Sequence, residues 1–485
     1  MRGCARTNRQ SSTSEHLPGG AAGRHTAGFS RTVCLYLAHK ETGIATPSRQ
    51  AGPIHFVVVT IGSAGDLFPF MAMALALRAA GHRVSFLAPV QHAPYVADSG
   101  LEFIGLPADE AVLHDPDLWH PTRGFGVVWR ATRPGMARIV AFVDALPADE
   151  KVVLLVHPLA LPEADLCRAL RPTLKVAAAY LAPQNLPTVH DPLLVGPWRV
   201  PPWVPFAARR ALWRWGARTF IDPVALPEVN AARAARGLRP MASLLTDLFG
   251  LADLSLTLFP AWFAPTQPDW PQPLVRAGFP LFDPKPDAAL SPALQRFLDA
   301  GPAPVAFTHG TGNFQAAAYF RDACAAVARR GLRAILLTPH RDQVPADLPP
   351  SVLWQDYVPL RRLLPRVAAL AHHGGIGTTA ESLRAGTPQL VVPLAHDQFD
   401  NAARVRALGV GVSLRADRVN AARLADRLMQ LTDNAAVAAQ CRAVSARFAG
   451  SDPMQTVVER LEALAGEGSR VAEQTGATAG GNRQE

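Results

Sequence analysis

Residues 372–401 read HHGGIGTTAESLRAGTPQLVVPLAHDQFDN. Hydrophobic strands alternate with helices in this stretch: one strand ends at His373, and Gln389–Pro393 forms the next one. Helices are predicted after these strands, at Thr378–Ala385 and Gln398–Leu408. Strands and helices that alternate in this way are typical of a parallel sheet covered by helices.

The same alternation continues on both sides of this stretch. A strand (IHFVVVTI) starts at Ile54 and precedes a helix at Leu67–Ala80, and a second alternating series starts with VAFTHGT at residues 305–311. Two such series predict an α/β protein with two doubly wound, Rossmann-like domains facing a cleft. The predicted boundaries are a disordered extension at 1–53, an N-terminal domain at 54–285, a linker at 286–302, a second domain at 303–445, a closing helix at 446–465 and a disordered tail at 466–485.

Composition excludes several classes of protein. The chain has 485 residues, 49% hydrophobic and 18% charged, which excludes wholesale disorder, and no uninterrupted apolar run is long enough for a transmembrane helix. The net charge of +9 is concentrated in residues 1–53, where seven Lys or Arg face two Glu, so it does not indicate a nucleic-acid partner. Five widely spaced cysteines and no secretory signal favour a cytoplasmic protein without a structural metal or disulfide framework.

The Gly-rich segment after the strand that ends at His373 has the composition of an anion site. His373 and Gly375 precede a helix that opens with Gly377, Thr378 and Thr379. Free backbone N–H groups, two hydroxyls and the helix dipole therefore converge at one point, which suits a diphosphate. An ordinary Gly-rich turn with a Thr cap is the alternative that these residues leave open.

A second polar pair follows one strand–helix unit later. Asp397 and Gln398 come directly after a strand, at the edge of a parallel sheet where ligands bind. A carboxylate and an amide at this edge suit sugar hydroxyls. The alternative is that Asp397 only caps the helix that starts at Gln398.

Taken together, these motifs resemble the family 1 glycosyltransferases, which use nucleotide sugars and have the GT-B fold. The resemblance covers about residues 54–465 and implies that residues 303–445 bind the donor and residues 54–285 the acceptor. The stretch that flanks the nucleoside base in this family departs from the plant members, which carry Trp at the position of Tyr357 and Gln at the position of Leu360. The implied donor contacts are Gly310, Thr311, His373, Gly375, Gly377, Thr378 and Thr379 at the diphosphate, Tyr357, Val358 and Glu381 at the nucleoside, and Asp397 and Gln398 at the sugar.

The loop Gly62–Asp66 (GSAGD) resembles a loop of bacterial members of the same family. By this resemblance Asp66 is the catalytic base of an inverting transfer, because attack by an acceptor hydroxyl or carboxyl benefits from a positioned proton acceptor. Its alternative role is the N-cap of the helix Leu67–Ala80. No metal is implied, since the helix start in the other domain stabilises the leaving diphosphate.

A narrower resemblance concerns the acceptor half. Residues 62–70 (GSAGDLFPF), 115–129 (DPDLWHPTRGFGVVW) and 258–283 (LFPAWFAPTQPDWPQPLVRAGFPLFD) are similar to bacterial rhamnosyltransferases of mono-rhamnolipid synthesis. That resemblance implies dTDP-L-rhamnose as donor and a 3-(3-hydroxyalkanoyloxy)alkanoate lipid as acceptor, with an acyl-dimer synthase as a partner. Two departures are Glu381, which suits a ribose better than a deoxyribose, and His309, which has no assigned role.

The segment 196–220 interleaves four Trp with five Arg. We expect one of two structures for this segment. The first is a lid over a hydrophobic acceptor, in which the lid also contacts anionic lipid at the inner membrane. The second is a helical hairpin that buries Trp while Arg stays solvated.

Three other functions remain open on the sequence alone: a UDP-sugar-dependent glucosyltransferase of a hydrophobic small molecule such as a sterol, flavonoid or macrolide, a sugar-nucleotide epimerase of the same fold, and a non-catalytic scaffold. We expect no cofactor besides the nucleotide sugar.

Overall fold

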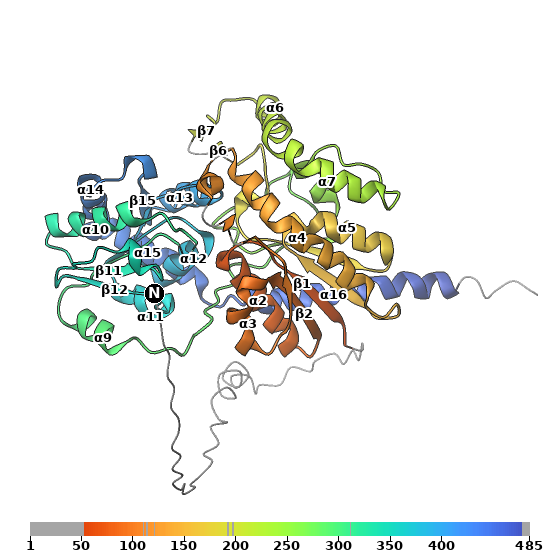
Figure 1. Cartoon of the computed structure of the whole chain (residues 1–485), viewed down its shortest axis with the longest axis horizontal. Helices are drawn as coiled ribbons and strands as arrows, with labels where there is room; N and C mark the ends of the chain where they lie inside the picture. Colours follow the sequence, from red (N-terminus) through yellow and green to blue (C-terminus); the bar gives the residue numbers. More distant parts are fainter. Residues whose placement is uncertain are drawn as a thin grey trace, which may run out of the picture. The chain divides into compact units, whose positions relative to one another are not determined.

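The computed structural model describes residues 53–109, 111–112, 115–120, 122–191, 194–195, 198–310 and 312–477 (Figure 1). The predicted N-terminal extension up to residue 52 and the end of the predicted tail, from residue 478, lie outside these residues. So does Thr311.

The first domain is built on a seven-stranded, all-parallel sheet in the order β3-β2-β1-β4-β5-β8-β9. The central strands are fully buried because both faces are covered, which explains why they read as unbroken β-branched runs. Their bounds are β1 His55–Val59, β2 Arg83–Pro89, β3 Glu102–Leu106, β4 Val152–Val156, β5 Lys175–Tyr180, β8 Leu254–Thr257 and β9 Leu274–Arg276.

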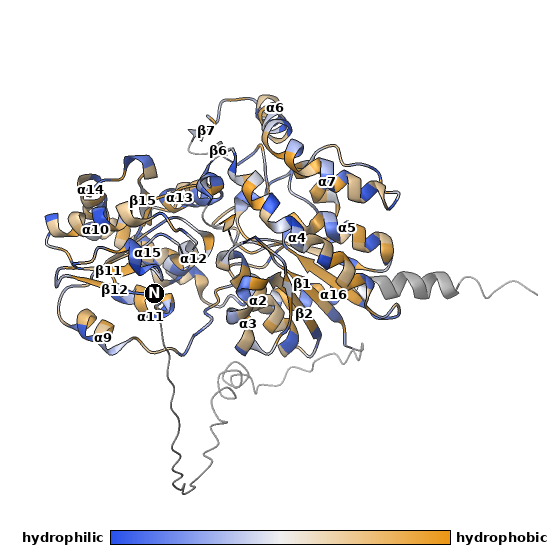
Figure 2. Cartoon of the chain, viewed as in Figure 1, coloured by the Kyte–Doolittle hydropathy of each residue, from blue (hydrophilic) through white to orange (hydrophobic). Residues whose placement is uncertain are grey.

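Helices cover both faces of this sheet (Figures 1 and 2). On one face, α2 (Ala64–Ala79) and α16 (Pro453–Ala477) pack against alternate residues of β1. On the other face lie α4 (Gly124–Asp144), α5 (Leu161–Leu170) and α7 (Asp222–Ala234). Short helices α3 and α8 span Ala93–Val96 and Leu244–Asp247.

The second domain repeats the plan with a six-stranded parallel sheet in the order β12-β11-β10-β13-β14-β15. The two Rossmann-like α/β domains are therefore confirmed. The strands are β10 Val305–Thr308, β11 Ala334–Leu337, β12 Val352–Gln355, β13 Ala369–His372, β14 Gln389–Val391 and β15 Gly411–Ser413, and the helices are α9 Pro292–Asp299, α10 Ala317–Arg329, α11 Leu360–Leu363, α12 Ile376–Ala385, α13 Gln398–Ala407, α14 Ala421–Thr432 and α15 Ala435–Ser445.

Two predicted boundaries need correction. The predicted linker at 286–302 contains α9, whose Leu294 and Leu298 are buried in a core with strands of the second sheet. The closing helix does not end at 465, since α16 continues to Ala477. Its buried Val457 and Leu461 pack under the first sheet, so the chain returns to the N-terminal domain after completing the second one.

A small antiparallel hairpin, β6 (Leu194–Val195) with β7 (Trp198–Arg199), leads into α6 (Phe206–Gly216). A π-helical turn at Ala217–Ile221 joins α6 to α7. Within the part of the chain that the structure describes, no helix is both long and apolar enough to cross a bilayer.

Candidate active site

The strand order of both sheets reverses at a central pair, β1 beside β4 and β10 beside β13. Loops that leave such a pair at the carboxyl ends of the strands form the usual ligand site of doubly wound folds. Asp66 follows β1, Gly310 follows β10 and His373 follows β13. The topology therefore places predicted site residues of each domain at its switch point.

Asp66 lies in the first turn of α2, which begins at Ala64 and not at Leu67. Ser63 is the N-cap, and Asp66 completes a capping box by accepting hydrogen bonds at Oδ2 from the Ser63 backbone N–H (2.8 Å) and hydroxyl (3.2 Å). The predicted N-cap role of Asp66 is therefore wrong: Ser63 is the N-cap, and Asp66 is the third helical residue of its capping box. Burial raises the pKa of the Asp66 carboxyl to about 6, against the hydrogen bonds from Ser63 that lower it.

The Gly62 turn before this helix is held by a residue that the sequence did not single out. The Nε2 atom of buried His92 lies 2.9 Å from the carbonyl oxygen of Gly62. Gly62 has φ +97°, and a Cβ at this position would lie 2.4 Å from Oδ2 of Asp66. A glycine is therefore required here for the carboxylate to fold back over the helix start.

The start of α12 is open. Its N-cap, Gly375, makes no side-chain capping bond, and a Cβ at Gly377 would meet no atom within 4 Å. Thr378 is half-buried at the same turn. The first backbone N–H groups of α12 thus point into accessible space without a side-chain acceptor, which is the arrangement that binds phosphate groups.

Two histidines lie beside this helix start. A Cβ on Gly375 would lie 2.6 Å from His373 Nε2, and one on Gly310 would lie 3.0 Å from His373 Cε1, so both glycines make room for the ring. The Nδ1 atoms of His373 and His309 are buried without a protein hydrogen-bond partner. Burial lowers the pKa of His373 to about 4 and that of His309 to about 3, so both rings are neutral. Buried polar atoms of this kind call for a ligand or water.

Three other predicted donor contacts serve the protein itself. Thr379 is buried, and its hydroxyl donates to the carbonyl of Gly375 (3.0 Å). Gln398 is buried, and its Oε1 accepts hydrogen bonds from the backbone of the preceding loop (2.8 and 3.2 Å). The side chain of Val358 is part of the core. Direct donor contacts by these side chains remain predictions.

The nucleoside-side residues differ in their surroundings. The Tyr357 side chain is 44% exposed, and its hydroxyl donates to Asp283 Oδ1 (2.6 Å) while Lys285 lies 5.8 Å over its ring. Burial and the hydrogen bond to Asp283 raise the pKa of Tyr357. Glu381 pairs through Oε2 with Arg384 (2.8 Å). Tyr357 is therefore tied to Asp283, and its contact with a nucleoside base stays a prediction.

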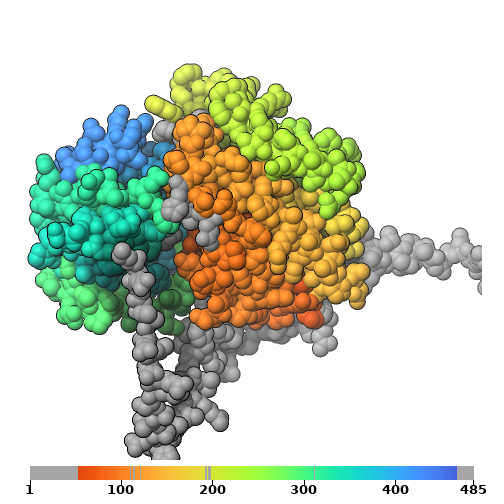
Figure 3. Space-filling model, viewed as in Figure 1, coloured from red at the N-terminus to blue at the C-terminus, as the bar shows by residue number. Residues whose placement is uncertain are grey.

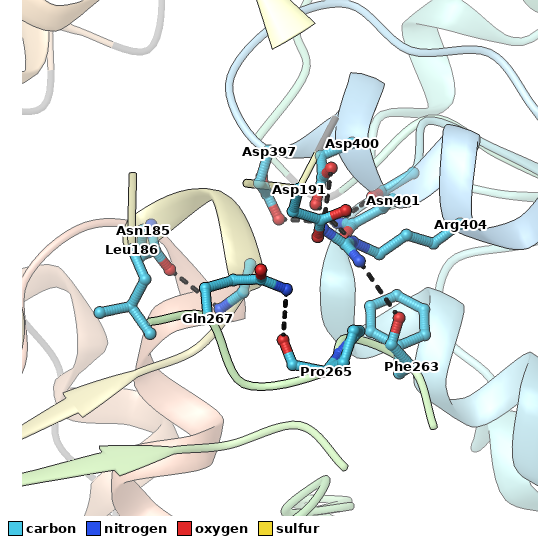
Figure 4. Close-up of polar contacts among 12 residues, drawn as sticks. Asn185, Leu186, Asp191, Phe263, Pro265, Gln267, Asp397, Asp400, Asn401 and Arg404 are labelled. Carbon is cyan, nitrogen blue, oxygen red and sulfur yellow. Dashed lines mark hydrogen bonds and ion pairs between the residues drawn. The ribbon is translucent and has the colours of Figure 1, made fainter. Parts of the chain in front are cut away.

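Asp397 is not used as a helix cap, although it occupies the N-cap position of α13. Its Oδ2 accepts a hydrogen bond from Asn401 Nδ2 (2.8 Å), which also donates to the carbonyl of Gly374 (2.9 Å) (Figure 4). Burial first, and then the nearby charge of Asp66, raise the pKa of Asp397 to about 7. The two carboxylates, one from each domain, therefore lie within electrostatic reach of each other.

The residue before Asp397 is strained. His396 has φ +54°, a left-handed conformation that residues other than glycine seldom adopt. Its ring packs edge-on against Trp119 of the N-terminal domain at a centroid distance of 5.9 Å. Strain of this kind persists at functional sites, where the surrounding contacts hold it.

Arg404, which lies in α13 about two turns after Asp397, connects the two domains. Its guanidinium pairs with Asp400 (2.7 Å) and with Asp191 (2.5 Å), and it donates to the carbonyl of Phe263 (3.3 Å) (Figure 4). These groups border a small pocket of about 30 Å³, which is room for about one or two water molecules. Its lining residues are Pro183, Gln184, Leu186, Pro187, Thr188, Asp191, Leu194, Trp213, Asp400 and Arg404.

Acidic and histidine side chains are not gathered into a metal-binding group anywhere in the described ranges. The polar groups of the site are instead the carboxylates of Asp66 and Asp397, neutral histidines and a helix start without a side-chain cap.

Comparisons with known proteins agree with this geometry. A model for the C-terminal domain of erythromycin biosynthesis protein CIII-like proteins matches residues 333–464, and one for the N-terminal domain of glycosyltransferase family 28 matches residues 56–142. The chain is 31% identical over 421 residues to O-mycaminosyltylonolide 6-deoxyallosyltransferase from Streptomyces fradiae, covering 82% of this chain and 93% of that protein. It is 30% identical over 371 residues to glycosyltransferase GtfE from Amycolatopsis orientalis, covering 73% and 84%.

A solved structure, spinosyn rhamnosyltransferase SpnG complexed with thymidine diphosphate, superimposes with a TM-score of 0.57 at 22% identity and covers 85% of this chain and all of that one. At this identity the likeness bears on the fold. The relative above 30% identity covers most of both chains, and the two domain models agree with it. The chain therefore belongs to the family 1 and 28 group of GT-B glycosyltransferases.

Proposed function

We propose that this glycosyltransferase takes a sugar from a nucleoside-diphosphate donor held by the second domain and transfers it, with inversion, to a hydroxyl or carboxyl of a hydrophobic small molecule. The observation that carries the proposal is the pairing of two half-sites. One is the uncapped start of α12 beside the unpartnered Nδ1 of His373, and the other is the Asp66–Asp397 carboxylate pair.

The donor diphosphate fits the start of α12. Phosphate oxygens would accept hydrogen bonds from the first-turn N–H groups and from a nitrogen of neutral His373. Developing negative charge on the leaving diphosphate would be stabilised by the same groups and by the helix dipole. Asp397, held by the buried Asn401, would then face the sugar, one helix away.

Asp66 is the proposed base. Both of its internal hydrogen bonds go to Oδ2, so Oδ1 remains to accept the proton of the acceptor hydroxyl. The acceptor oxygen forms a bond to the anomeric carbon as the bond to the diphosphate breaks, and the released proton goes to Asp66. One displacement on the face opposite the leaving group inverts the anomeric configuration.

The acceptor class is supported by the relatives. Relatives act on mycaminosyltylonolide, vancomycin aglycone and sterols by their names, which suggests a preformed hydrophobic small molecule of macrolide, glycopeptide or sterol type. The small pocket at Arg404 has room for only about one or two water molecules, and its two carboxylates pair with Arg404, so the proposed acceptor class rests on the relatives.

A second candidate is transfer of L-rhamnose from dTDP-L-rhamnose to a 3-(3-hydroxyalkanoyloxy)alkanoate lipid. The observation that favours it is the aromatic and arginine-rich helix α6, whose Trp213 lines the same pocket. An acyl chain and a carboxylate suit these side chains. Only this candidate function implies an acyl-dimer synthase as a partner protein.

The test is a matrix of donors and acceptors with mass detection of products. Purified protein is incubated with dTDP-rhamnose, dTDP-glucose or UDP-glucose, each with a macrolide, a sterol, a flavonoid or a hydroxyalkanoate dimer. A new glycoside that requires both substrates supports the proposal, and the productive pair decides between the candidates. Isomerised donor formed without acceptor would instead indicate an epimerase.

Metal removal is expected to leave turnover nearly unchanged. The proposed anion site consists of backbone N–H groups, a hydroxyl and a neutral imidazole, which need no divalent ion to hold a diphosphate. Initial rates are compared before and after chelation. Loss of activity on chelation, with recovery in magnesium, would contradict the metal-independent site.

The pH profile should report the Asp66 carboxyl. Its pKa is raised to about 6, and the base works only when deprotonated, so kcat/KM should be low at acid pH and rise through about pH 6 to a plateau. The residual activity of Asp66→Asn should lack this rising limb. A variant that keeps the limb would assign the titration to another group.

Gly310→Ala is expected to raise the donor KM by roughly tenfold or more, because the added methyl group meets the His373 ring at 3.0 Å and the residue has φ +86°. Gly331→Ala is the matched control. Gly331 also has positive φ, +61°, but a Cβ there meets nothing within 4 Å. If Gly331→Ala raises the donor KM as much as Gly310→Ala does, backbone strain accounts for the effect and the contact with His373 does not.

A further inference from the structure

The segment between Asp191 and Asp222 has an unusual charge pattern. Residues 192–221 contain five Arg, four Trp and two Phe, and no Asp, Glu or Lys. The two bounding carboxylates are already engaged, since Asp191 pairs with Arg404 and Asp222 accepts from the backbone of Leu244. The positive charge of this segment is therefore not balanced within it.

Its large side chains are exposed. Among the described residues, eight large hydrophobic side chains are exposed, and half of them lie here: Trp198 (67%), Trp203 (81%), Phe206 (51%) and Trp215 (56%). The predicted hairpin with buried Trp is wrong for three of the four tryptophans. Figure 3 shows the yellow-green residues of this segment at the molecular surface, and Figure 2 shows hydrophilic residues interspersed along α6.

Arginine surrounds these aromatic groups. Arg199, Arg210, Arg214 and Arg218 are exposed, while Arg209 is buried. We call the three aromatic side chains Trp203, Phe206 and Trp215, together with these four exposed arginines, the α6 surface. Exposed aromatic rings among exposed cations are the combination found where proteins rest on an anionic bilayer.

The α6 surface is held rigidly. Arg209 donates to the carbonyls of Val189 (2.8 Å) and Pro202 (2.5 Å), and Trp213 Nε1 donates to the carbonyl of Thr188 (3.3 Å). Phe206 and Trp215 are thus presented by an anchored helix, and Trp203 by the loop that Arg209 holds at Pro202, so less side-chain and backbone entropy is lost on docking.

We propose that the α6 surface docks on an anionic lipid bilayer. Aromatic rings would enter the headgroup region, and the arginines would pair with lipid phosphates. The contact is peripheral in character, since it consists of the side chains of a short helix and its preceding loop. Trp213 donates to the carbonyl of Thr188, and both residues line the small pocket at Arg404, so the bilayer would lie on the proposed acceptor side of the protein, a consequence that rests on the proposed function.

The experiment is co-sedimentation of the full chain with vesicles. Phosphatidylglycerol–phosphatidylethanolamine vesicles are compared with phosphatidylcholine vesicles at low and high salt. Binding to the anionic vesicles that weakens with salt is expected. Absence of binding, or equal salt-insensitive binding to both vesicle types, would overturn the proposal.

Variants of the full chain locate the contact. Arg210→Gln, Arg214→Gln and Arg218→Gln together should weaken anionic-vesicle binding by on the order of 10²-fold, about fivefold for each charge. Trp203→Ala, Phe206→Ala and Trp215→Ala together should weaken it by at least about tenfold. The control removes three exposed arginines of the second domain, Arg321, Arg329 and Arg442, and should change binding by less than about twofold.

Every variant keeps the basic residues of 1–53, so differences among them report the α6 surface alone. Titration with nucleoside diphosphate checks that each variant is folded, independently of any acceptor. If the α6 variants bind vesicles like the control, or if they only convert a dimer to a monomer in light scattering, the surface serves another purpose and the proposal fails. Loss of vesicle binding with intact transfer would leave the proposed function standing.

Discussion

Replacing Asp66 with Asn is expected to lower kcat by about 10²–10⁴-fold while donor affinity changes little. Asn is close in size to Asp and keeps an oxygen that can accept from the Ser63 backbone, so much of the capping box survives. What is lost is the proton acceptor at the junction of the two half-sites. Steady-state rates and donor titration on the same protein separate the two effects.

Ser63→Ala is the control for this result. It removes the other half of the same capping box, the hydroxyl that accepts from Gly65 N–H (3.2 Å). It should cost about 1 kcal/mol of stability and leave kcat within a few-fold. If Asp66→Asn turns over at the wild-type rate, Asp66 is a structural cap, and the base must be sought among other acceptor-side groups.

Replacing His373 with Ala is the second large effect we expect. Removing one hydrogen bond to a charged diphosphate costs about 1.5–3 kcal/mol, which corresponds to roughly 10–150-fold weaker donor binding. Because the same contact stabilises the leaving group, kcat should fall too. Calorimetric titration with the nucleoside diphosphate measures the binding term without an acceptor.

Two further variants sharpen this test. His373→Asn keeps a donor of hydrogen bonds and should recover part of the affinity. His82→Ala removes a histidine that pairs with Glu462, outside the proposed site, and should bind the nucleotide as the unmodified protein does. Equal affinities for all four proteins would remove His373 from the donor site.

Much of the fold follows from local sequence. Unbroken β-branched strands and Gly-terminated helices predicted both Rossmann-like domains, because parallel strands are buried on both faces. The short strands β12 and β15 were not predicted, since three or four residues carry too little periodicity. The sequence around α9 predicted a linker because of its flanking prolines. Leu294 and Leu298 pack against the core of the second domain, and this packing cannot be recognised from the local sequence.

The loops of the site were predictable, but their contacts were not. Glycine and hydroxyl residues mark the start of α12 in the sequence itself. By contrast, Arg404 meets Asp191 from 213 residues away, and His92 reaches Gly62 from a helix with no motif. The surroundings of His309 could not be predicted either: its Nδ1 is buried without a protein hydrogen-bond partner, and its ring stacks on Tyr319 at a centroid distance of 4.3 Å. These contacts depend on tertiary packing.

The acceptor-side resemblance is explained in part by packing. In residues 258–283, Phe263, Trp270 and Phe279 are buried, and Phe279 stacks on Phe448 (6.0 Å, 16°). A shared aromatic pattern there can reflect a shared core between the domains and need not report the acceptor. For this reason, the relatives bear more directly on the acceptor class than this stretch does.

The most direct test of the central claim is the anomeric configuration of the product. Donor and product are compared by the one-bond carbon–proton coupling at the anomeric carbon, measured on the glycoside formed by the productive donor–acceptor pair. A single displacement between the start of α12 and Asp66 predicts that the configuration is inverted in every product molecule. A product with the donor's own configuration would contradict the account, because it requires a second displacement or a different face of attack.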